Sequence, residues 1–229
     1  MKNFEEMIPE KLTGRLKKCL DFSGNLTNKK ILNIGCSFGW LEKFAAKEKC
    51  REIIGMDING ENISKARNSI NDNRVTFIQG DALNLTRFKR EYFDIVTIFD
   101  VIEHLPKNSE KELFKQIYRI LKINGKLVIS TPYDCFLSNI LDPAWYFGHR
   151  HYSLRKILPC LKQEGFEIDS TEIKGGFNEL ISMIIFYFFK WVFKREMLLK
   201  NYLNTKRDYE YNKQIENGFA TLFIGAVRK

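Results

Sequence analysis

Short apolar runs alternate regularly with longer polar or amphipathic segments along most of the chain. Five of these runs have the length of a buried strand, and they begin near Ile31, Glu52, Arg74, Phe93 and Lys126. Strands separated by helical segments pair in parallel, because a parallel pair needs a long crossover connection. Two later runs, GFEIDSTEIK and GFATLFIGAVRK, supply the last two strands. The pattern predicts an α/β fold with helices on both faces of a mostly parallel sheet.

The length of the chain limits the number of domains. With 229 residues, 44% of them hydrophobic, the chain can bury one sizeable core, so we expect residues 1–229 to form a single domain. In an open parallel sheet, ligands bind beyond the carboxyl ends of the strands, near the point where the strand order reverses. The residues that follow each strand are therefore the first candidates for chemistry.

Local signals place several helices. An amphipathic helix is expected within the first twenty residues, where apolar residues recur with a period near 3.6. Ser109 and Glu112 form an S-x-x-E capping box at the start of another helix, which the Asn-Gly pair at 124–125 should end. A helix beginning near Ser153 contains Pro159, which should kink it or end it early.

The first strand runs into a turn of small residues, in the sequence ILNIGCSFGW. Gly35 and Gly39 let the backbone approach a ligand, and the helix that follows offers its N-terminus to negative charge. The spacing is GxxxG, so the dinucleotide fingerprint GxGxxG is absent. A nucleotide-binding turn and a plain strand-to-helix turn both fit so short a match.

Acidic residues follow the next three strands. Asp57 comes 18 residues after Gly39, where a carboxylate can accept hydrogen bonds from both hydroxyls of a ribose or cap the next helix. Asp81 can accept from an adenine amino group or cap a turn, and Asp100 follows the fourth strand. Each acid is ambiguous by itself. The turn and the three acids occur in register on successive strands, however, and together they favour a nucleotide-like cofactor.

The motifs LNIGCSFG, GMDI, GDAL and FDVIEHL together resemble those of the class I S-adenosylmethionine-dependent methyltransferases, over residues 29–170 and the final strand. The resemblance implies a Rossmann-like sheet of seven strands, whose last strand is antiparallel and lies between the fifth and the sixth. It places the glycine turn and Asp100 near the methionine moiety, Asp57 at the ribose and Asp81 at the adenine. The contacts with S-adenosylmethionine that it implies are Asn33, Gly35, Cys36, Gly39, Asp57, Ile58, Asp81, Ala82 and Asp100.

Two residues depart from the family pattern. Asn33 stands where the family usually has an acid, so a carboxylate that would face the cofactor's ammonium group becomes a neutral amide. A charge-assisted hydrogen bond is about twice as strong as a neutral one, so the change should weaken cofactor binding. Ser37 replaces the middle glycine, which requires a backbone angle φ that a residue with a side chain can adopt.

All three histidines lie in motif-like places, at His104 in VIEHL and at His149 and His151 in YFGHRHYS. Methyl transfer is an in-line displacement, so the protein mainly positions the acceptor and, for a hydroxyl or an amine, removes a proton. Histidine suits that step near neutral pH. We predict His149 or His151 as the base, with Tyr133 and Tyr152 shaping the pocket. The alternative is that His104 and one of the pair are structural.

Cysteine usage and charge limit the cofactors and the compartment. The five cysteines are odd in number and form no CxxC pair, and no histidine is spaced to them as a zinc ligand, so we expect no metal site. The first residues lack an apolar leader, which predicts a cytoplasmic protein with reduced thiols. The net charge of +9 favours anionic partners or reflects a lysine-rich proteome.

An aromatic insert, residues 177–215, separates the last two strands and should be helical. Ser182 and Lys190 interrupt an otherwise apolar and aromatic run from Leu180 to Phe193, after which basic residues are frequent. The run is too short to span a bilayer, which takes about 20 residues. It fits a lid over an apolar pocket, a homodimer interface, or a helix lying peripherally at the membrane. Nucleic-acid binding is disfavoured, because the apolar run is too continuous.

These observations predict an S-adenosylmethionine-dependent methyltransferase that methylates oxygen or nitrogen of a small, apolar or lipid-linked acceptor. A second hypothesis is a non-catalytic S-adenosylmethionine-binding protein that acts as an interaction or membrane-docking module, which Asn33 supports and the sequence HRHYS opposes. A third, a dinucleotide-dependent oxidoreductase, lacks the GxGxxG fingerprint.

Overall fold

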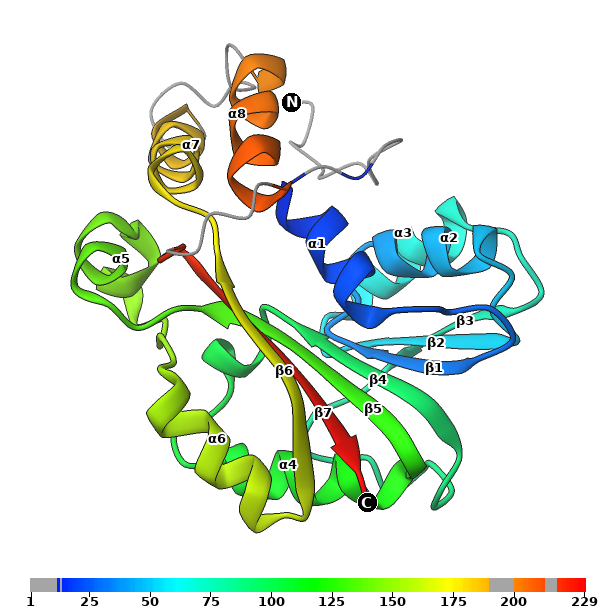
Figure 1. The fold of residues 1–229 in the computed structure, drawn as a ribbon. Coiled ribbons are helices and arrows are strands. Elements are labelled where there is room, and N and C mark those ends of the chain that lie inside the picture. The colour runs from blue at the N-terminus through cyan, green and yellow to red at the C-terminus, as the bar shows by residue number, and fades with distance from the viewer. Residues whose placement is uncertain (1–11, 13, 190–199, 213–217) are drawn as a thin grey trace.

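A computed structural model describes residues 12, 14–189, 200–212 and 218–229. Seven strands form one sheet with the order β3-β2-β1-β4-β5-β7-β6 (Figure 1). The strands are β1 (Lys30–Ile34), β2 (Glu52–Asp57), β3 (Val75–Gln79), β4 (Phe93–Phe99), β5 (Leu121–Pro132), β6 (Phe166–Lys174) and β7 (Thr221–Arg228).

Strand directions agree with the predicted topology. Strands β1 to β5 pair in parallel with one another. The last strand, β7, lies between β5 and β6 and runs antiparallel to both. Its register pairs Ile129 of β5 with Ile224, and Thr171 of β6 with the same residue. The Rossmann-like sheet with an antiparallel last strand is therefore confirmed.

Helices cover both faces of the sheet, with α1, α2 and α3 on one face and α4 and α6 on the other (Figure 1). Their bounds are α1 (Gly14–Ser23), α2 (Trp40–Lys47), α3 (Gly60–Ser69), α4 (Glu110–Ile120), α5 (Phe136–Leu141), α6 (Leu154–Gln163), α7 (Phe177–Phe188) and α8 (Lys200–Asn212). Two short 3-10 helices, η1 (Ile102–His104) and η2 (Pro143–Phe147), complete the described elements.

The alternation of strand side chains explains why both faces are covered. In β1, Leu32 and Ile34 pack in the core beneath α4 and α6, whereas Ile31 packs in the core beneath α1 and α2. Leu127 and Val128 in β5 divide between the two cores in the same way. Strands buried on both faces appear in sequence as continuous apolar runs, which is the pattern that predicted the sheet.

The prediction of a capping box at α4 is wrong. Ser109 already has helical backbone angles (φ −87°, ψ −3°), so its hydroxyl turns back and donates to the carbonyl of Pro106 at 2.7 Å. The carboxylate of Glu112 accepts instead from Gln116 one turn later, at 3.0 Å. The helix also ends at Ile120, before the Asn-Gly pair, because the next residue, Leu121, pairs with β4 in the sheet.

Pro159 neither ends nor shortens α6, which continues to Gln163. A proline in a helix leaves the carbonyl four residues earlier without its N–H partner. Here that carbonyl belongs to Arg155, and both Arg155 and Pro159 are exposed. Water can therefore satisfy the free carbonyl.

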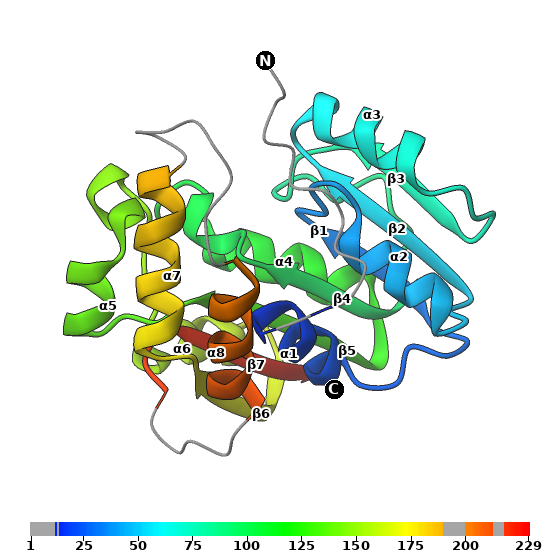
Figure 2. The same cartoon turned by 90° about the horizontal axis from the view of Figure 1, so that it is seen from above.

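The insert before β7 contains α7 and α8, which pack against each other beside α1 (Figure 2). The backbone N–H of Gly14 at the start of α1 donates to the carboxylate of Asp208 in α8. Residues 190–199 and 213–217, which include part of the apolar run to Phe193, lie outside the described residues. So does most of the helix expected in the first twenty residues. In the described part of the chain, no helix is both long and apolar enough to cross a bilayer.

Candidate active site

The strand order reverses at β1, which pairs with β2 on one side and with β4 on the other. The carboxyl ends of these strands carry the residues that the motifs singled out. The turn of residues 35–39 follows β1, Asp57 ends β2, and Asp100 comes directly after β4. This edge of the sheet is the place where ligands of open α/β folds bind.

The glycine turn has a conformation that only glycine adopts freely. Gly35 (φ +77°) donates its N–H to the carbonyl of Met56 at 2.7 Å, and a Cβ at this position would overlap the side chain of Val101. Gly39 (φ +84°) is the N-cap residue directly before α2, and a Cβ there would lie 2.6 Å from the ring of Phe77. The side chains of Val101 and Phe77 therefore pack directly against the turn, which requires glycine at both positions.

The side chain of Cys36 lies in the core beneath α3 and is fully buried. Burial, helped by the nearby carboxylates of Glu42 and Asp57, raises the pKa of its thiol well above the ordinary value. The thiol is therefore protonated at neutral pH and inert as a nucleophile. Any contact of Cys36 with a ligand in this site would come from its backbone.

Asp57 fixes the turn from the neighbouring strand. One carboxylate oxygen accepts from the backbone N–H of Ser37 at 2.8 Å, and the other accepts from Asn59 at 2.9 Å. The cap of α3 is Asn59, whose side chain accepts from two N–H groups, so Asp57 is not the helix cap. Ser37 has φ +48°, a left-handed conformation that few residues with side chains adopt. Next to Asp57, the side chain of Ile58 is 72% exposed.

Asp81 and Ala82 form the beginning of a turn after β3. A carboxylate oxygen of Asp81 accepts from the backbone N–H of Leu83 at 2.9 Å, which is the turn-capping role that the sequence left open. The side chain of Asp81 is exposed, whereas Ala82 is buried.

Asn33 is engaged by protein groups on both sides of its amide. Its Nδ2 donates to Oε1 of Glu42 at 2.9 Å, and its Oδ1 accepts from the hydroxyl of Thr97 at 2.9 Å. Asn33 and Glu42 are both buried, and burial raises the pKa of Glu42 to about 7. The sequence prediction did not include Glu42, whose helix position gave no sign of a partner in β1.

Asp100 forms an ion pair that the sequence did not reveal. The guanidinium Nη1 of Arg15 in α1 lies 2.9 Å from its Oδ2, and the hydroxyl of Ser130 donates to its Oδ1 at 3.2 Å. The Nε of Arg15 is buried and has no hydrogen-bond partner among the described residues. Asp100 has φ +54°. This uncommon conformation turns the residue away from the direction of β4.

Glu103 lies close behind Asp100. Its carboxyl group is buried and accepts from the hydroxyl of Thr131 at 3.0 Å. Burial and the negative charge of Asp100 both raise the pKa of Glu103 well above the ordinary value. Glu103 therefore holds a proton more firmly than a surface glutamate does.

His104 and His149 come together although 45 residues separate them in sequence. Their rings meet edge to face with centroids 4.3 Å apart. Partial burial, with the charge of His149 as a second cause, lowers the pKa of His104. The His104 imidazole is therefore neutral at pH 7 and can accept a proton. The negative charge of Asp100, which precedes η1 in sequence, acts in the opposite direction and is the smallest of the three causes.

His151 lies in a different environment. Its side chain is buried, Nε2 lies 3.0 Å from a carboxylate oxygen of Asp142, and Nδ1 lies 2.8 Å from Oδ1 of Asn139. Tyr152 is fully buried too, and its hydroxyl donates to Glu110 at 2.6 Å. Tyr152 could therefore shape the predicted pocket only from the interior.

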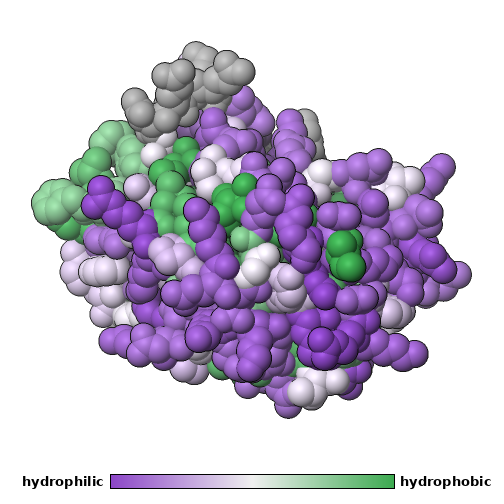
Figure 3. All heavy atoms as spheres, turned by 60° about the horizontal axis from the view of Figure 1, so that its bottom comes forward, coloured by the Kyte–Doolittle hydropathy of each residue, from purple (hydrophilic) through white to green (hydrophobic). Residues whose placement is uncertain are grey.

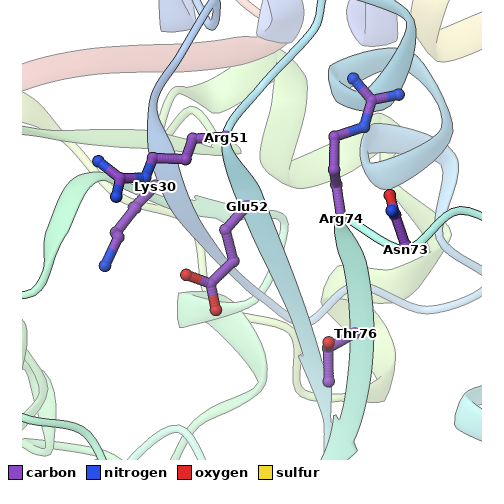
Figure 4. A pocket seen from close by; sticks show the side chains of 6 residues that line it. All are labelled: Lys30, Arg51, Glu52, Asn73, Arg74 and Thr76. Atoms are coloured by element: carbon purple, nitrogen blue, oxygen red, sulfur yellow. The ribbon is translucent and has the colours of Figure 1, made fainter.

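A separate hollow lies at the amino ends of the strands, opposite the candidate site (Figure 4). It is lined by the first residues of β1 and β2, Lys30 and Glu52, by Thr76 near the start of β3, and by Arg51, Asn73 and Arg74 from the connecting loops. This is the amino end of the strands, where open α/β sheets do not place their ligands. Within the described residues, no three histidine, cysteine or acidic side chains cluster in a way that could hold a metal ion.

Comparison with known proteins identifies part of the chain. The methyltransferase-domain family matches residues 32–129. A ubiquinone biosynthesis O-methyltransferase from Aliivibrio fischeri is 27% identical over 119 residues, covering 51% of this chain and 50% of that protein. The corresponding protein of Yersinia enterocolitica is 26% identical over 119 residues and is covered to 48%. The chain thus spans about half the length of the curated relatives it matches.

Solved structures share the fold along nearly the whole chain. An S-adenosylmethionine-dependent methyltransferase from Mesorhizobium loti superposes with a TM-score of 0.65 at 16% identity, covering 93% of this chain and 97% of that one. For phosphoethanolamine N-methyltransferase 2 of Haemonchus contortus, the TM-score is 0.68 at 23% identity. The match covers 93% of this chain and 52% of that one. Residues 32–129 therefore match the methyltransferase-domain family, and the chain has the fold of the class I S-adenosylmethionine-dependent methyltransferases that its motifs resemble.

Proposed function

We propose that this protein transfers the methyl group of S-adenosylmethionine to a hydroxyl or amine on a small apolar or lipid-linked acceptor. The observation that carries the proposal is the Arg15–Asp100 pair, 2.9 Å apart, at the end of β4. The methionine end of the cofactor carries one carboxylate and one ammonium group. A guanidinium and a carboxylate side by side complement both charges, and Arg15 has an unused buried N–H.

The other residues at the carboxyl ends of the strands fit the remainder of the cofactor. In this proposal the turn from Gly35 to Gly39, which lies at the carboxyl end of β1, holds the part between the methionine and the ribose. Each oxygen of Asp57 accepts one backbone N–H, and a carboxylate oxygen has a further lone pair for a ribose hydroxyl. The exposed side chain of Ile58 offers an apolar surface to the adenine. Asp81 and Ala82 complete the adenine end.

Asn33 does not contact the cofactor in this proposal. Its amide is already paired with Glu42 and Thr97 inside the protein. Its role is to hold β1 and α2 together on either side of the glycine turn. The loss of the family's acid at this position therefore does not itself remove a cofactor contact.

The cofactor supplies an activated methyl group, and the protein supplies position and a proton acceptor. We assign the base to the pair of His149 and His104, because their rings touch and the His104 imidazole is neutral at pH 7. His151 remains a candidate by sequence, but both of its ring nitrogens already face the acceptors of Asp142 and Asn139. In this assignment His151 positions the segment that carries His149.

An apolar acceptor agrees with the surroundings of the histidine pair. The segment between β5 and α6 carries His149, and it exposes several large hydrophobic side chains, among them Phe136 and Tyr146. The curated relatives are ubiquinone biosynthesis O-methyltransferases, and ubiquinone is a lipid. Both points favour a lipid-linked acceptor over a soluble polar metabolite.

Methyl transfer is tested with S-adenosylmethionine labelled in its methyl group, incubated with extracts of lipids, glycans and small metabolites. We expect label in the lipid fraction, and its loss in the His149→Ala variant with unchanged affinity for S-adenosylhomocysteine. Binding of S-adenosylhomocysteine without transfer to any fraction would instead support the non-catalytic hypothesis.

The solved structures that share this fold include the [4+2]-cyclase SpnF, with a TM-score of 0.65 at 16% identity, covering 93% of this chain and 80% of that one. Fold likeness alone therefore does not decide the reaction.

A further inference from the structure

Exposed hydrophobic side chains concentrate on three neighbouring elements. Of the thirteen large hydrophobic residues that are exposed in the described part of the chain, nine lie on α5, η2 and α7. In Figure 3, hydrophobic side chains gather at the upper left edge of the molecule, on the side of α5 and α7 in Figure 1. We call these nine residues the apolar face: Phe136, Leu137, Ile140, Trp145, Tyr146, Phe177, Ile181, Ile184 and Phe188.

On α7 the exposed residues form a single stripe. Phe177, Ile181, Ile184 and Phe188 follow one another at spacings of four, three and four residues, which places them on one side of a helix. A surface helix of a soluble protein normally turns its polar side outward. Here the outward side is apolar.

Polar contacts anchor the opposite side of α7. The carboxylate of Glu210 in α8 accepts from the backbone N–H groups of Gly176, Asn178 and Glu179 at the start of the helix. The guanidinium of Arg207 donates to Glu179 at 2.8 Å. The orientation of α7 is therefore set by α8, so the apolar stripe faces outward in a helix that is firmly held.

Helix α5 packs against α7, and η2 packs against α5, so their exposed residues continue the stripe. Trp145 and Tyr146 in η2 contribute rings with a polar group, and the hydroxyl of Tyr146 donates to the carbonyl of Ile140 at 3.2 Å. Amphipathic rings of this kind are enriched where proteins meet the boundary between lipid and water.

We propose that the apolar face docks on the surface of a membrane that contains anionic lipids. The sequence that continues from α7 provides the complementary charge, since residues 190–200 include Lys190, Lys194, Arg195 and Lys200 and only one acid, Glu196. Basic residues next to an apolar surface strengthen binding to anionic headgroups. Helix α7 packs against α5 and α8 within the folded protein. In this proposal it therefore lies along the membrane surface.

Docking in this orientation places the site next to the lipid. Helix α5 follows directly after β5, and η2 leads into His149, so the apolar face adjoins the histidine pair. A lipid-linked acceptor could keep its chain in the bilayer while its reactive group reaches the site. This consequence rests on the proposed function, whereas docking itself does not.

Docking is tested by co-sedimentation with vesicles of phosphatidylcholine alone and of phosphatidylcholine with phosphatidylglycerol, without cofactor or acceptor. We expect the full chain to bind the anionic vesicles and to be released by salt. The variant Ile181→Glu/Ile184→Glu should lose roughly tenfold or more in partitioning. The matched control is Ile123→Glu, because Ile123 is 62% exposed but lies at the opposite end of β5. A second variant, Lys194→Gln/Arg195→Gln, should lose only the preference for anionic lipid.

Two results would overturn the docking proposal. One is a vesicle assay in which the apolar face has no effect, because neither protein binds anionic vesicles or because wild type and the double glutamate variant bind equally. The other is a concentration-dependent dimer that the double glutamate variant abolishes, which would assign the apolar face to a second copy of the chain. Thermal melting of each variant checks that it is folded. Failure of vesicle binding leaves methyl transfer to soluble acceptors unaffected, so the two proposals fail separately.

Discussion

The amide of Asn33 donates a hydrogen bond to the carboxyl group of Glu42 at 2.9 Å, inside the protein and beneath the glycine turn. An aspartate at position 33, the usual family residue by resemblance, would place a second acid against Glu42. Two buried carboxyl groups this close could not both ionise. We therefore interpret Asn33 as the neutral partner of an acid that α2 supplies. In this interpretation Asn33 is a structural adjustment, and it is no sign that the protein has stopped using the cofactor.

The Asn33–Glu42 pair predicts how stability depends on pH. Burial raises the pKa of Glu42 from 4.5 to about 7, so between these values the folded state binds the proton more tightly than the unfolded state does. The free energy of unfolding must then fall as pH rises from 4.5 to 7, by about 3 kcal/mol at most. The Glu42→Gln variant keeps the acceptor for Asn33 and removes this loss. Urea denaturation should show the variant more stable than wild type at pH 8 and equal to it at pH 4.5.

A surface substitution, Glu48→Gln, serves as the control, because Glu48 is exposed. The free energy of unfolding of Glu48→Gln should equal that of wild type at both pH values. If Glu42→Gln is less stable than wild type at pH 8, the carboxylate of Glu42 contributes a favourable interaction, and the proposed pairing is wrong.

The glycine turn predicts a difference between two alanine substitutions. Gly35 and Gly24 have the same φ of +77°, but a Cβ at Gly35 would overlap Val101, whereas a Cβ at Gly24 would meet nothing within 4 Å. Gly24→Ala should cost about 1 kcal/mol of unfolding free energy, from backbone strain alone. Gly35→Ala should cost a further 1–3 kcal/mol or so, from overpacking. It should also weaken binding of S-adenosylhomocysteine, measured by calorimetry. If Gly35→Ala and Gly24→Ala lower the free energy of unfolding equally, Val101 does not pack closely against Gly35.

Arg15 predicts a binding defect that leaves the fold intact. Arg15→Gln should weaken binding of S-adenosylhomocysteine by roughly tenfold or more, because a charge-assisted contact contributes on the order of 1.5–3 kcal/mol. Asp100 keeps its hydrogen bond from Ser130, so the local structure should survive. Arg155→Gln is the matched control, since Arg155 is exposed on α6. An unchanged affinity in Arg15→Gln would remove Arg15 from the cofactor site.

The sheet was predictable because its strands are buried on both faces and so appear as apolar runs, which turn residues separate. The glycine turn and the acids Asp57 and Asp100 were predictable because each lies directly after a strand. Arg15 and Glu42 were not, since each reaches its partner from a helix and no local spacing records that contact. Arg15 lies in α1, which packs against β4 although the two elements are far apart in sequence.

Local motifs failed where backbone geometry decided the outcome. The S-x-x-E pattern at Ser109 is correct in letters, but the residue already has helical angles, so its hydroxyl cannot cap. Pro159 is tolerated in α6, where Arg155, whose carbonyl it leaves without an N–H partner, is exposed. The first outcome depends on the backbone angles of one residue and the second on solvent exposure, and sequence spacing contains neither.

The two histidines of HRHYS should separate into a structural and a chemical role. His151→Ala leaves the carboxylate of Asp142, 3% exposed, without its ring partner, which should cost roughly 3–5 kcal/mol of unfolding free energy. His149→Ala removes only a half-buried ring that contacts His104, so its melting temperature should stay close to that of wild type. Its methyl transfer should fall by about 10²–10⁴-fold, as expected when a general base is lost.

Thermal melting and methyl transfer, measured on the same preparations of both variants, distinguish these roles. Affinity for S-adenosylhomocysteine should be unchanged in His149→Ala, since that ring faces the acceptor side in the proposal. The conservative change His149→Gln tests the chemistry further, because an amide preserves polarity without accepting a proton at neutral pH. Normal turnover in His149→Gln would contradict a base at this position. A stable but inactive His151→Ala would transfer that role to His151, which would then have to leave Asp142 during the reaction.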